Sequence, residues 1–231
     1  MTLDPDIIHF DVPLDSPLVK WEAHLESLRG VLLMSEQALE DYINNKRVAA
    51  NASRTIAVSK FDDKEEKLDV YCEHQAEWQN TEENFRLFYV SHFRNHFLVA
   101  LCSIFESGLE QSANYLCEKR GISAKCNIRT KGKKSTNNYL VEFFSERLNI
   151  DVHPAEPQDK AVMEATYKIR NIIAHNNSTL LTDADRNKIR LLSEQDIKIE
   201  SGIVIVTLLY LEKLFAIVNR AFVVINRETC K

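Results

Sequence analysis

The sequence predicts an all-α fold with long antiparallel helices and one small β-hairpin before the last helix. Chain breakers are scarce, with five Gly and five Pro in 231 residues, which favours long helices. Apolar residues recur at helical spacing over several long segments. Residues 196–200 alternate polar and apolar side chains, and a Ser-Gly turn and the apolar run 203–206 follow, as in a β-hairpin.

The first third of the chain predicts an irregular arm over 1–16 and an N-terminal helical region over 17–80. An amphipathic helix is expected over 18–46, because apolar residues recur there every three or four positions. Ser16-Pro17 suits its start, since Pro is tolerated in a first turn, and Asn44-Asn45 suits its end. The stretch 49–67 is polar and charged, and indicates a connection or a weak helix.

The remaining residues, 81–231, are expected to form the helical core. A long helical region over 68–119 is predicted to break near Asn80-Thr81, where a hydroxyl followed by two acids suits a helix start. A loop is expected over 121–137. Shorter helices are predicted at 138–148, 159–175 and 207–226, with the β-hairpin ahead of the last one.

Composition indicates a soluble cytosolic protein. The five cysteines show no CxxC pairing, which is typical of reduced intracellular thiols. The acidic N-terminus lacks a signal-peptide pattern, and the apolar runs are too short to span a bilayer. The net charge of −5 argues against a general nucleic-acid coat protein and is compatible with a local basic site.

The chemically informative segment ends the helix predicted over 159–175. Arg170, Asn171 and His175 interrupt an otherwise apolar run there. Asn171 and His175 are four residues apart and share a helix face, while Arg170 lies about 100° to one side of Asn171. A structural helix end, in which His175 caps carbonyls and Arg170 forms a salt bridge, is the alternative interpretation of the same residues.

These residue types suit RNA cleavage through the 2′-hydroxyl. An imidazole can remove or supply a proton near neutral pH, and a guanidinium can bind the scissile phosphate in the transition state. One imidazole cannot readily act on both sides of the phosphate. The chemistry therefore predicts a homodimer in which two copies of the motif share one cleft.

The segment IRNIIAH, residues 169–175, resembles the R-x4-6-H motif of the HEPN superfamily, including the polar residue after the Arg. The similarity extends over roughly residues 82–226, with a long apolar helix before the motif and a helix after it. It implies a HEPN-like helical bundle that dimerises through the motif face and acts as a metal-independent, cofactor-free endoribonuclease. Arg170 and His175 then form the catalytic pair, with Asn171 as a supporting polar group.

Many HEPN proteins act in toxin–antitoxin, phage-defence or RNA-processing systems, so an antitoxin or defence-system partner is expected. In some HEPN toxins a Tyr two residues after the His is modified by a partner enzyme. This chain has Asn177 there, which argues against that mode of neutralisation. A non-catalytic HEPN module that binds nucleotide, RNA or a protein partner remains the alternative, and residues 1–60 lie outside the resemblance.

Two further groups of residues are candidates for the site. Glu106 or Glu110, on the apolar helix before the motif, is a candidate to orient Arg170, with Glu106 preferred because Ile104 and Phe105 beside it are apolar. A Glu at the solvated edge of its helix is the alternative interpretation. A basic loop in an otherwise acidic protein is a candidate path for the RNA backbone, although charged loops are usually only solvated. Its basic residues are Lys119, Arg120, Lys125, Arg129, Lys131, Lys133 and Lys134.

His92 and His96 are four residues apart and share a helix face. No HExxH pattern or third ligand accompanies them, so a packing role is expected and no metal site is predicted.

Overall fold

The computed structural model describes residues 16–130, 132, 135–153, 156–176, 178–179, 182–183, 196–200 and 202–230. Most of them are helical, and the strands among them form one two-stranded antiparallel sheet, which confirms the all-α prediction. Lys131, Lys133 and Lys134 of the basic loop, Asn177 and the arm over 1–15 lie outside the described residues. None of the described helices is both long and apolar enough to cross a membrane.

Helix α1 spans Pro17–Val58 and is longer than the sequence predicted. The Ser16 hydroxyl caps its start by accepting a bond from the Leu18 amide, as expected. The helix does not end at Asn44-Asn45 but continues for more than three further turns. Its continuation packs on α2, and such tertiary packing outweighs weak local preferences.

Helix α2 spans Lys64–Phe85 and is followed without a break by a π-helical turn, Arg86–Val90, and by α3, Ser91–Lys119. The predicted break near Asn80-Thr81 is therefore wrong. The Thr81 hydroxyl donates to the Glu77 carbonyl within the helix instead of capping a new one. The N-terminal cap is Asp63, whose carboxylate accepts bonds from the Glu65 and Glu66 amides.

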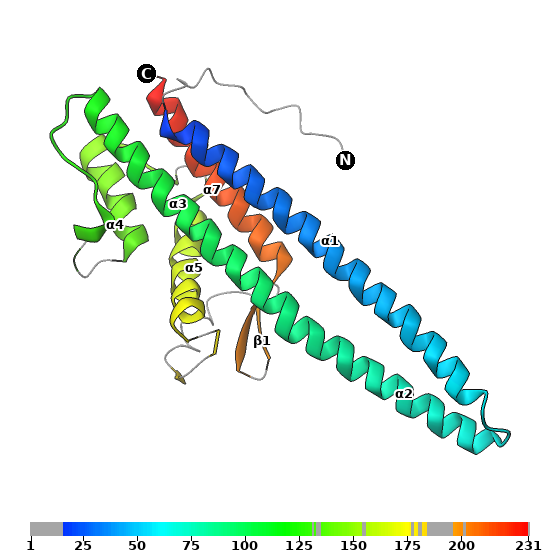
Figure 1. Cartoon of the computed structure of the whole chain (residues 1–231). Coiled ribbons are helices and arrows are strands. Elements are labelled where there is room, and N and C mark those ends of the chain that lie inside the picture. Colours follow the sequence, from blue (N-terminus) through cyan, green and yellow to red (C-terminus); the bar gives the residue numbers. More distant parts are fainter. Residues whose placement is uncertain are drawn as a thin grey trace.

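Helix α3 is the centre of the body, with α1, α4, α5 and α7 packed around it (Figure 1). Its buried side chains join one continuous apolar core with those of the surrounding helices. Gly108 permits close packing, because a Cβ there would lie 2.6 Å from Cζ of the buried Phe222 on α7.

The elements after α3 follow the predictions closely. Helix α4, Thr136–Phe143, continues as the π-helical turn Phe144–Leu148 and stops at Asn149, which has a left-handed backbone. Helix α5 spans Pro157–Asn176. Strands β1, Ile197–Glu200, and β2, Ile203–Val206, form the expected antiparallel hairpin. Helix α7, Leu208–Thr229, is capped by the Thr207 hydroxyl.

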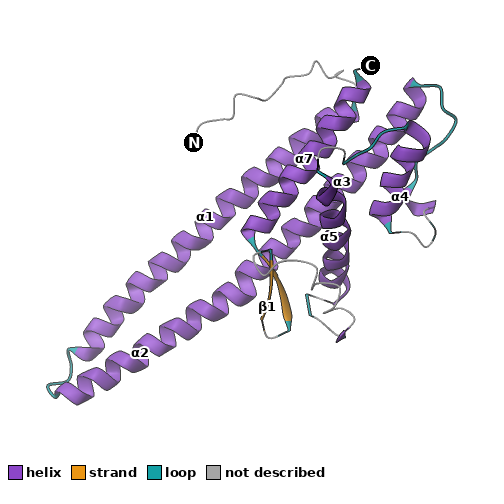
Figure 2. Ribbon diagram, turned by 180° about the vertical axis from the view of Figure 1, so that it is seen from behind, coloured by secondary structure: helices purple, strands orange, loops and turns teal. Residues whose placement is uncertain are grey.

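The outer end of α1 and the whole of α2 extend as a two-helix projection away from the body, while the sheet lies beside the end of α5 (Figure 2). The projection, residues 44–85, is called the hairpin arm below. The arm is joined by polar contacts, including Arg47–Glu82 at 2.8 Å and the Arg54 guanidinium over the Tyr71 ring at 4.3 Å.

Candidate active site

The three motif side chains lie at the C-terminal end of α5. The same helix buries Met163, Ile169 and Ile172 in the core, which holds the helix against the body. Asn171 and His175 are exposed, and Arg170 is partly buried. The structure therefore presents the predicted catalytic residues at the surface, on a helix whose other face is held by the core.

Arg170 lies between solvent and the core. Its Nη1 donates a hydrogen bond of 3.1 Å to Oδ1 of the adjacent Asn171. Its Nε is buried and has no hydrogen-bond partner among the described residues. Asn171 therefore contacts the Arg170 guanidinium directly, and its supporting role in catalysis stays a prediction.

A buried polar cluster on α3 and α5 lies behind Arg170. Glu106 is 9% exposed. Burial raises the pKa of the Cys102 thiol to about 12, the Glu106 carboxylate adds to the rise, and Arg170 opposes it. Burial also raises the pKa of the Tyr167 hydroxyl. Cys102 and Glu106 add to this rise, and Arg170 opposes it. Glu106 and Arg170 therefore act on the same two buried groups, and the orientation of Arg170 by Glu106 stays a prediction.

Glu110, the other acid considered for Arg170, has a different role. Its Oε1 accepts a hydrogen bond of 2.9 Å from the Ile128 amide. This contact holds the segment after α3 rather than the motif, and Glu106 is the acid that lies near Arg170.

The chain that leaves α5 is tied to both α3 and β2. Asn95 on α3 donates bonds through Nδ2 to the Ser178 hydroxyl at 2.8 Å and to the Val204 carbonyl at 3.0 Å. The Val204 amide in turn donates to the Ser178 carbonyl at 2.9 Å, and Ser178 has a left-handed backbone with φ of 66°. These bonds fix the exit of the chain three residues after His175.

Asn95 was not identified from the sequence, although it lies between His92 and His96 in the same apolar run. An Asn within such a run needs a partner when buried. That partner is distant in the chain, so its identity could not be inferred. Tyr167 was also missed, because a Tyr on a helix face gives no local indication of a charged neighbour.

The described part of the basic loop lies far from the motif within one chain. Asn95, which contacts Ser178, and Lys119 are 24 residues apart on α3, which corresponds to about 36 Å. The loop begins at the end of α3 remote from the β-hairpin (Figure 1). The structure does not bring Lys119 and His175 together in a single chain.

Two of the basic residues are engaged in intramolecular contacts. The Lys119 ammonium donates to the Thr229 carbonyl. The Arg120 guanidinium donates to the Leu148 carbonyl at 2.8 Å and to the Glu228 carboxylate at 2.9 Å. These contacts join the end of α3 to the end of α7 and to the π-helical turn after α4, whereas Lys125 and Arg129 are exposed.

The histidines on α3 form no cluster with other ligand types. His96 is exposed, and its Nδ1 lies 2.6 Å from the His92 carbonyl oxygen one turn earlier. Among the described residues, no group of three His, Cys, Asp or Glu side chains is arranged to hold a metal ion. A hollow of about 510 Å³ lies at the other end of α5, beside Glu146, His153 and Lys160.

Protein-family models, curated protein sequences and solved structures gave no match to this chain.

Proposed function

We propose that this protein is a metal-independent endoribonuclease of the HEPN type, with Arg170 and His175 as its catalytic residues. The observation that carries the proposal is the joint presentation of Arg170, Asn171 and His175 at one solvent-facing helix end, backed by the buried Glu106. A group that only stabilised the helix end would not require a buried carboxylate behind the guanidinium. The substrate is RNA, and no metal or organic cofactor takes part.

The chemistry follows from the side chains. An imidazole removes the proton of the 2′-hydroxyl, whose oxygen attacks phosphorus, and the bond to the 5′-oxygen breaks. The products are a 2′,3′-cyclic phosphate and a 5′-hydroxyl, which takes up a proton from a general acid. The Arg170 guanidinium binds the phosphate oxygens and stabilises the charge of the transition state.

The exposure of His175 supports a composite site in a homodimer. One imidazole cannot lie at both the 2′-oxygen and the departing 5′-oxygen, which are on opposite sides of phosphorus. A second copy related by a twofold axis provides the second imidazole. In this arrangement one His175 acts as base and the other as acid.

Glu106 acts as a positioning residue for Arg170. A carboxylate that is 9% exposed favours a nearby cation, and Glu106 and Arg170 act on the same buried groups, Cys102 and Tyr167. Glu106 therefore restrains the position of the Arg170 guanidinium by its attraction, without contacting RNA. An antitoxin or another defence-system protein is the expected regulator of such a site.

The test is incubation of purified protein with total RNA in excess EDTA, followed by analysis of the RNA ends. Wild type is expected to cleave and to leave cyclic-phosphate ends. His175→Ala and Arg170→Ala are expected to lower the rate about 10²–10⁴-fold while the circular dichroism spectrum stays unchanged. His24→Ala is the matched control, since His24 is an exposed histidine on α1, and it is expected to cleave like wild type.

Wild-type rates in both motif variants would refute the proposal. Loss of cleavage by EDTA would refute its metal-independent chemistry. Absence of cleavage in all samples, with RNA binding that is weakened by Arg170→Ala, would instead assign the same surface to a non-catalytic HEPN module.

A further inference from the structure

Helix α1 carries a second row of residues on the face opposite the core. Positions 31, 34, 38, 41, 45, 48 and 52 follow the alternating three- and four-residue spacing of a coiled-coil seam. All seven are exposed. The row is called the outer seam, and its residues in order are Val31, Met34, Ala38, Asp41, Asn45, Val48 and Ala52.

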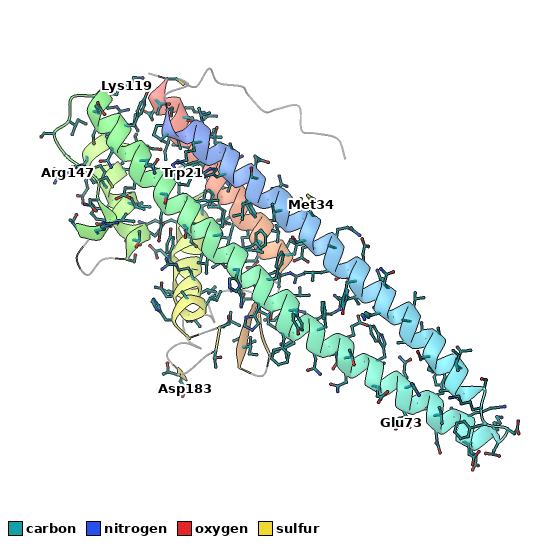
Figure 3. All side chains as sticks on the ribbon, in the orientation of Figure 1. Trp21, Met34, Glu73, Lys119, Arg147 and Asp183 are labelled. Atoms are coloured by element: carbon teal, nitrogen blue, oxygen red, sulfur yellow. The ribbon has the colours of Figure 1, made fainter. Side chains whose placement is uncertain are left out.

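The outer seam is largely apolar although water surrounds it. Met34 is 75% exposed and Val48 is 68% exposed, and Met34 projects from the side of α1 away from α3 (Figure 3). The opposite face of the same helix buries Leu18, Leu25 and Leu32. A helix with apolar residues on two opposite faces normally packs on both.

The borders of the outer seam suit close approach of another helix. The flanking heptad positions between residues 35 and 51 carry no charged residue; they are Ser35, Gln37, Tyr42, Asn44, Ala49 and Asn51. A shallow, mainly apolar hollow of about 390 Å³ adjoins Ala38 and extends to Tyr42, Phe85 and Phe93. The surface therefore offers both a seam and a recess for an apolar side chain.

Asp41 is the only charged residue in the outer seam, and it determines which occupant fits. A parallel second copy would place Asp41 against Asp41, where like charges repel. An antiparallel second copy places Asp41 opposite Asn45, whose carboxamide N–H groups can donate to the carboxylate. The outer seam is thus complementary to a second copy of itself only when the two helices run antiparallel.

Side-chain size agrees with the antiparallel register. The same register places Met34 opposite Ala52 of the second copy and Ala38 opposite Val48 of the second copy. Each layer then combines a larger with a smaller residue, which lets facing side chains interdigitate. Val48 of the second copy enters beside Ala38, where the apolar hollow lies.

We propose that α1 packs antiparallel against α1 of a second copy of this chain through the outer seam, with Asp41 opposite Asn45. This interface is distinct from the motif, because α5 packs on the other side of α3 (Figures 1 and 2). It goes beyond the proposed ribonuclease function and leaves Arg170 and His175 accessible. A chain that also dimerises through the motif then assembles into a tetramer or a larger species.

Directional cross-linking tests the register. The exposed cysteines are first removed by Cys72→Ser and Cys230→Ser. In this background Ala38→Cys and Val48→Cys are made as two separate variants. Each is expressed alone, and the two are also co-expressed with different tags. Oxidation is expected to link the co-expressed pair and not either variant alone. Two copies of position 38 are offset by ten residues, about 15 Å along the helix, which is too far for a disulfide.

Two results would overturn the proposal: no link in the co-expressed pair, or efficient linking of one variant with itself, which would indicate a parallel contact. A mass measurement by sedimentation supports the test. Met34→Lys combined with Val48→Lys is expected to halve the mass of the assembly. Leu68→Lys, an equally exposed apolar position on α2, is the control that keeps the mass.

The RNA assay separates this interface from the proposed function. The seam variants are expected to retain the RNA cleavage rate of wild type per chain, because the motif is not in the seam. An unchanged mass in the seam variants overturns the interface and leaves the ribonuclease proposal intact.

Discussion

The inner half of α1 buries Leu18, Leu25 and Leu32 against the body, whereas Ile43 is the last buried residue on its outer half. None of the described residues 64–85 of α2 is buried. The two halves therefore belong to regions with different sources of stability. Burial of apolar area stabilises the body, while ion pairs, a cation–π contact and half-buried side chains join the hairpin arm.

This difference also separates two kinds of surface. In the body, the core fixes one face of α5, so Arg170 and His175 are presented from a rigid support. In the hairpin arm, the helices expose apolar side chains such as Val48 and Leu68. A helix pair without buried residues depends on other contacts for its stability, which is consistent with assembly through the outer seam.

The largest expected effect is the loss of stability when a leucine is replaced by alanine, a substitution made once in each region. Leu98→Ala, at a core position of α3 with no exposure, is expected to lower the free energy of unfolding by about 2–5 kcal/mol. Leu68→Ala, at 61% exposure on α2, is expected to change it by less than about 0.5 kcal/mol. Urea unfolding followed by circular dichroism measures both.

Equal losses of unfolding free energy in Leu98→Ala and Leu68→Ala would contradict the difference between the body and the hairpin arm. They would mean that another chain or segment covers Leu68 in solution. Sedimentation of Leu68→Ala then shows whether its loss accompanies a change of assembly.

A smaller effect is expected from two ion pairs on the same helices. Arg94 binds Glu36 through two hydrogen bonds of 2.7 Å, and Glu36 is 8% exposed. Arg94→Met leaves this carboxylate without its cation, and a loss of about 3 kcal/mol is expected. Arg86 binds Glu40 at 2.6 Å with both side chains about 40% exposed, so Arg86→Met is expected to cost less than about 1 kcal/mol.

Salt provides the control for this pair of variants. The effect of Arg86→Met is expected to shrink as sodium chloride is added, because exposed charges are screened, whereas that of Arg94→Met persists. Replacing Glu36 by Leu together with Arg94→Met is expected to recover part of the loss, since the unpaired buried charge is removed. No recovery would show that packing of the Arg94 side chain, rather than its charge, stabilises the body.

The sequence predicted the body better than the hairpin arm, for a physical reason. Helices α5 and α7 and the β-hairpin follow from local periodicity and turn residues. The arm packs through Arg47, Ala50 and Arg54 on α1, which show no apolar periodicity, so the helix was expected to end at Asn44-Asn45. The contacts that stabilise the hairpin arm join residues far apart in the chain, so no local sequence pattern indicates them.

The residues of the candidate site also fall into those that the local sequence predicts and those that it does not. Arg170, Asn171 and His175 were found because polar residues interrupt an apolar helix end. The contacts of Asn95 with Ser178 and Val204 span 83 and 109 residues and were not predictable. Lys119 and Arg120 were expected to face RNA, but their partners Thr229 and Glu228 lie more than 100 residues away.

The smallest expected effect is on the pH dependence of stability, which differs between His153 and the Glu40–Arg86 ion pair. Burial lowers the pKa of His153 from its usual 6.5, against the opposing charges of Asp159 and Asp151. Its Nε2 is buried without a hydrogen-bond partner among the described residues. The unfolded chain therefore binds this proton more tightly, and the free energy of unfolding falls as the pH decreases below about 6.5. One proton limits this slope to about 1.4 kcal/mol per pH unit.

Glu40 on α1, just before the hairpin arm, responds to pH in a different range. Its hydrogen bond with Arg86 lowers its pKa from the usual 4.5, so its contribution is present above that pH and is lost below it. Urea unfolding over a pH series is expected to show that His153→Leu flattens the decline below about pH 6.5. Glu40→Gln is expected to lower the free energy of unfolding above about pH 4.5 and to change its slope with pH only below about pH 4.5. An unchanged slope in His153→Leu would mean that the protonated imidazole finds an acceptor in the folded body, of which Asp151 is the nearest in sequence.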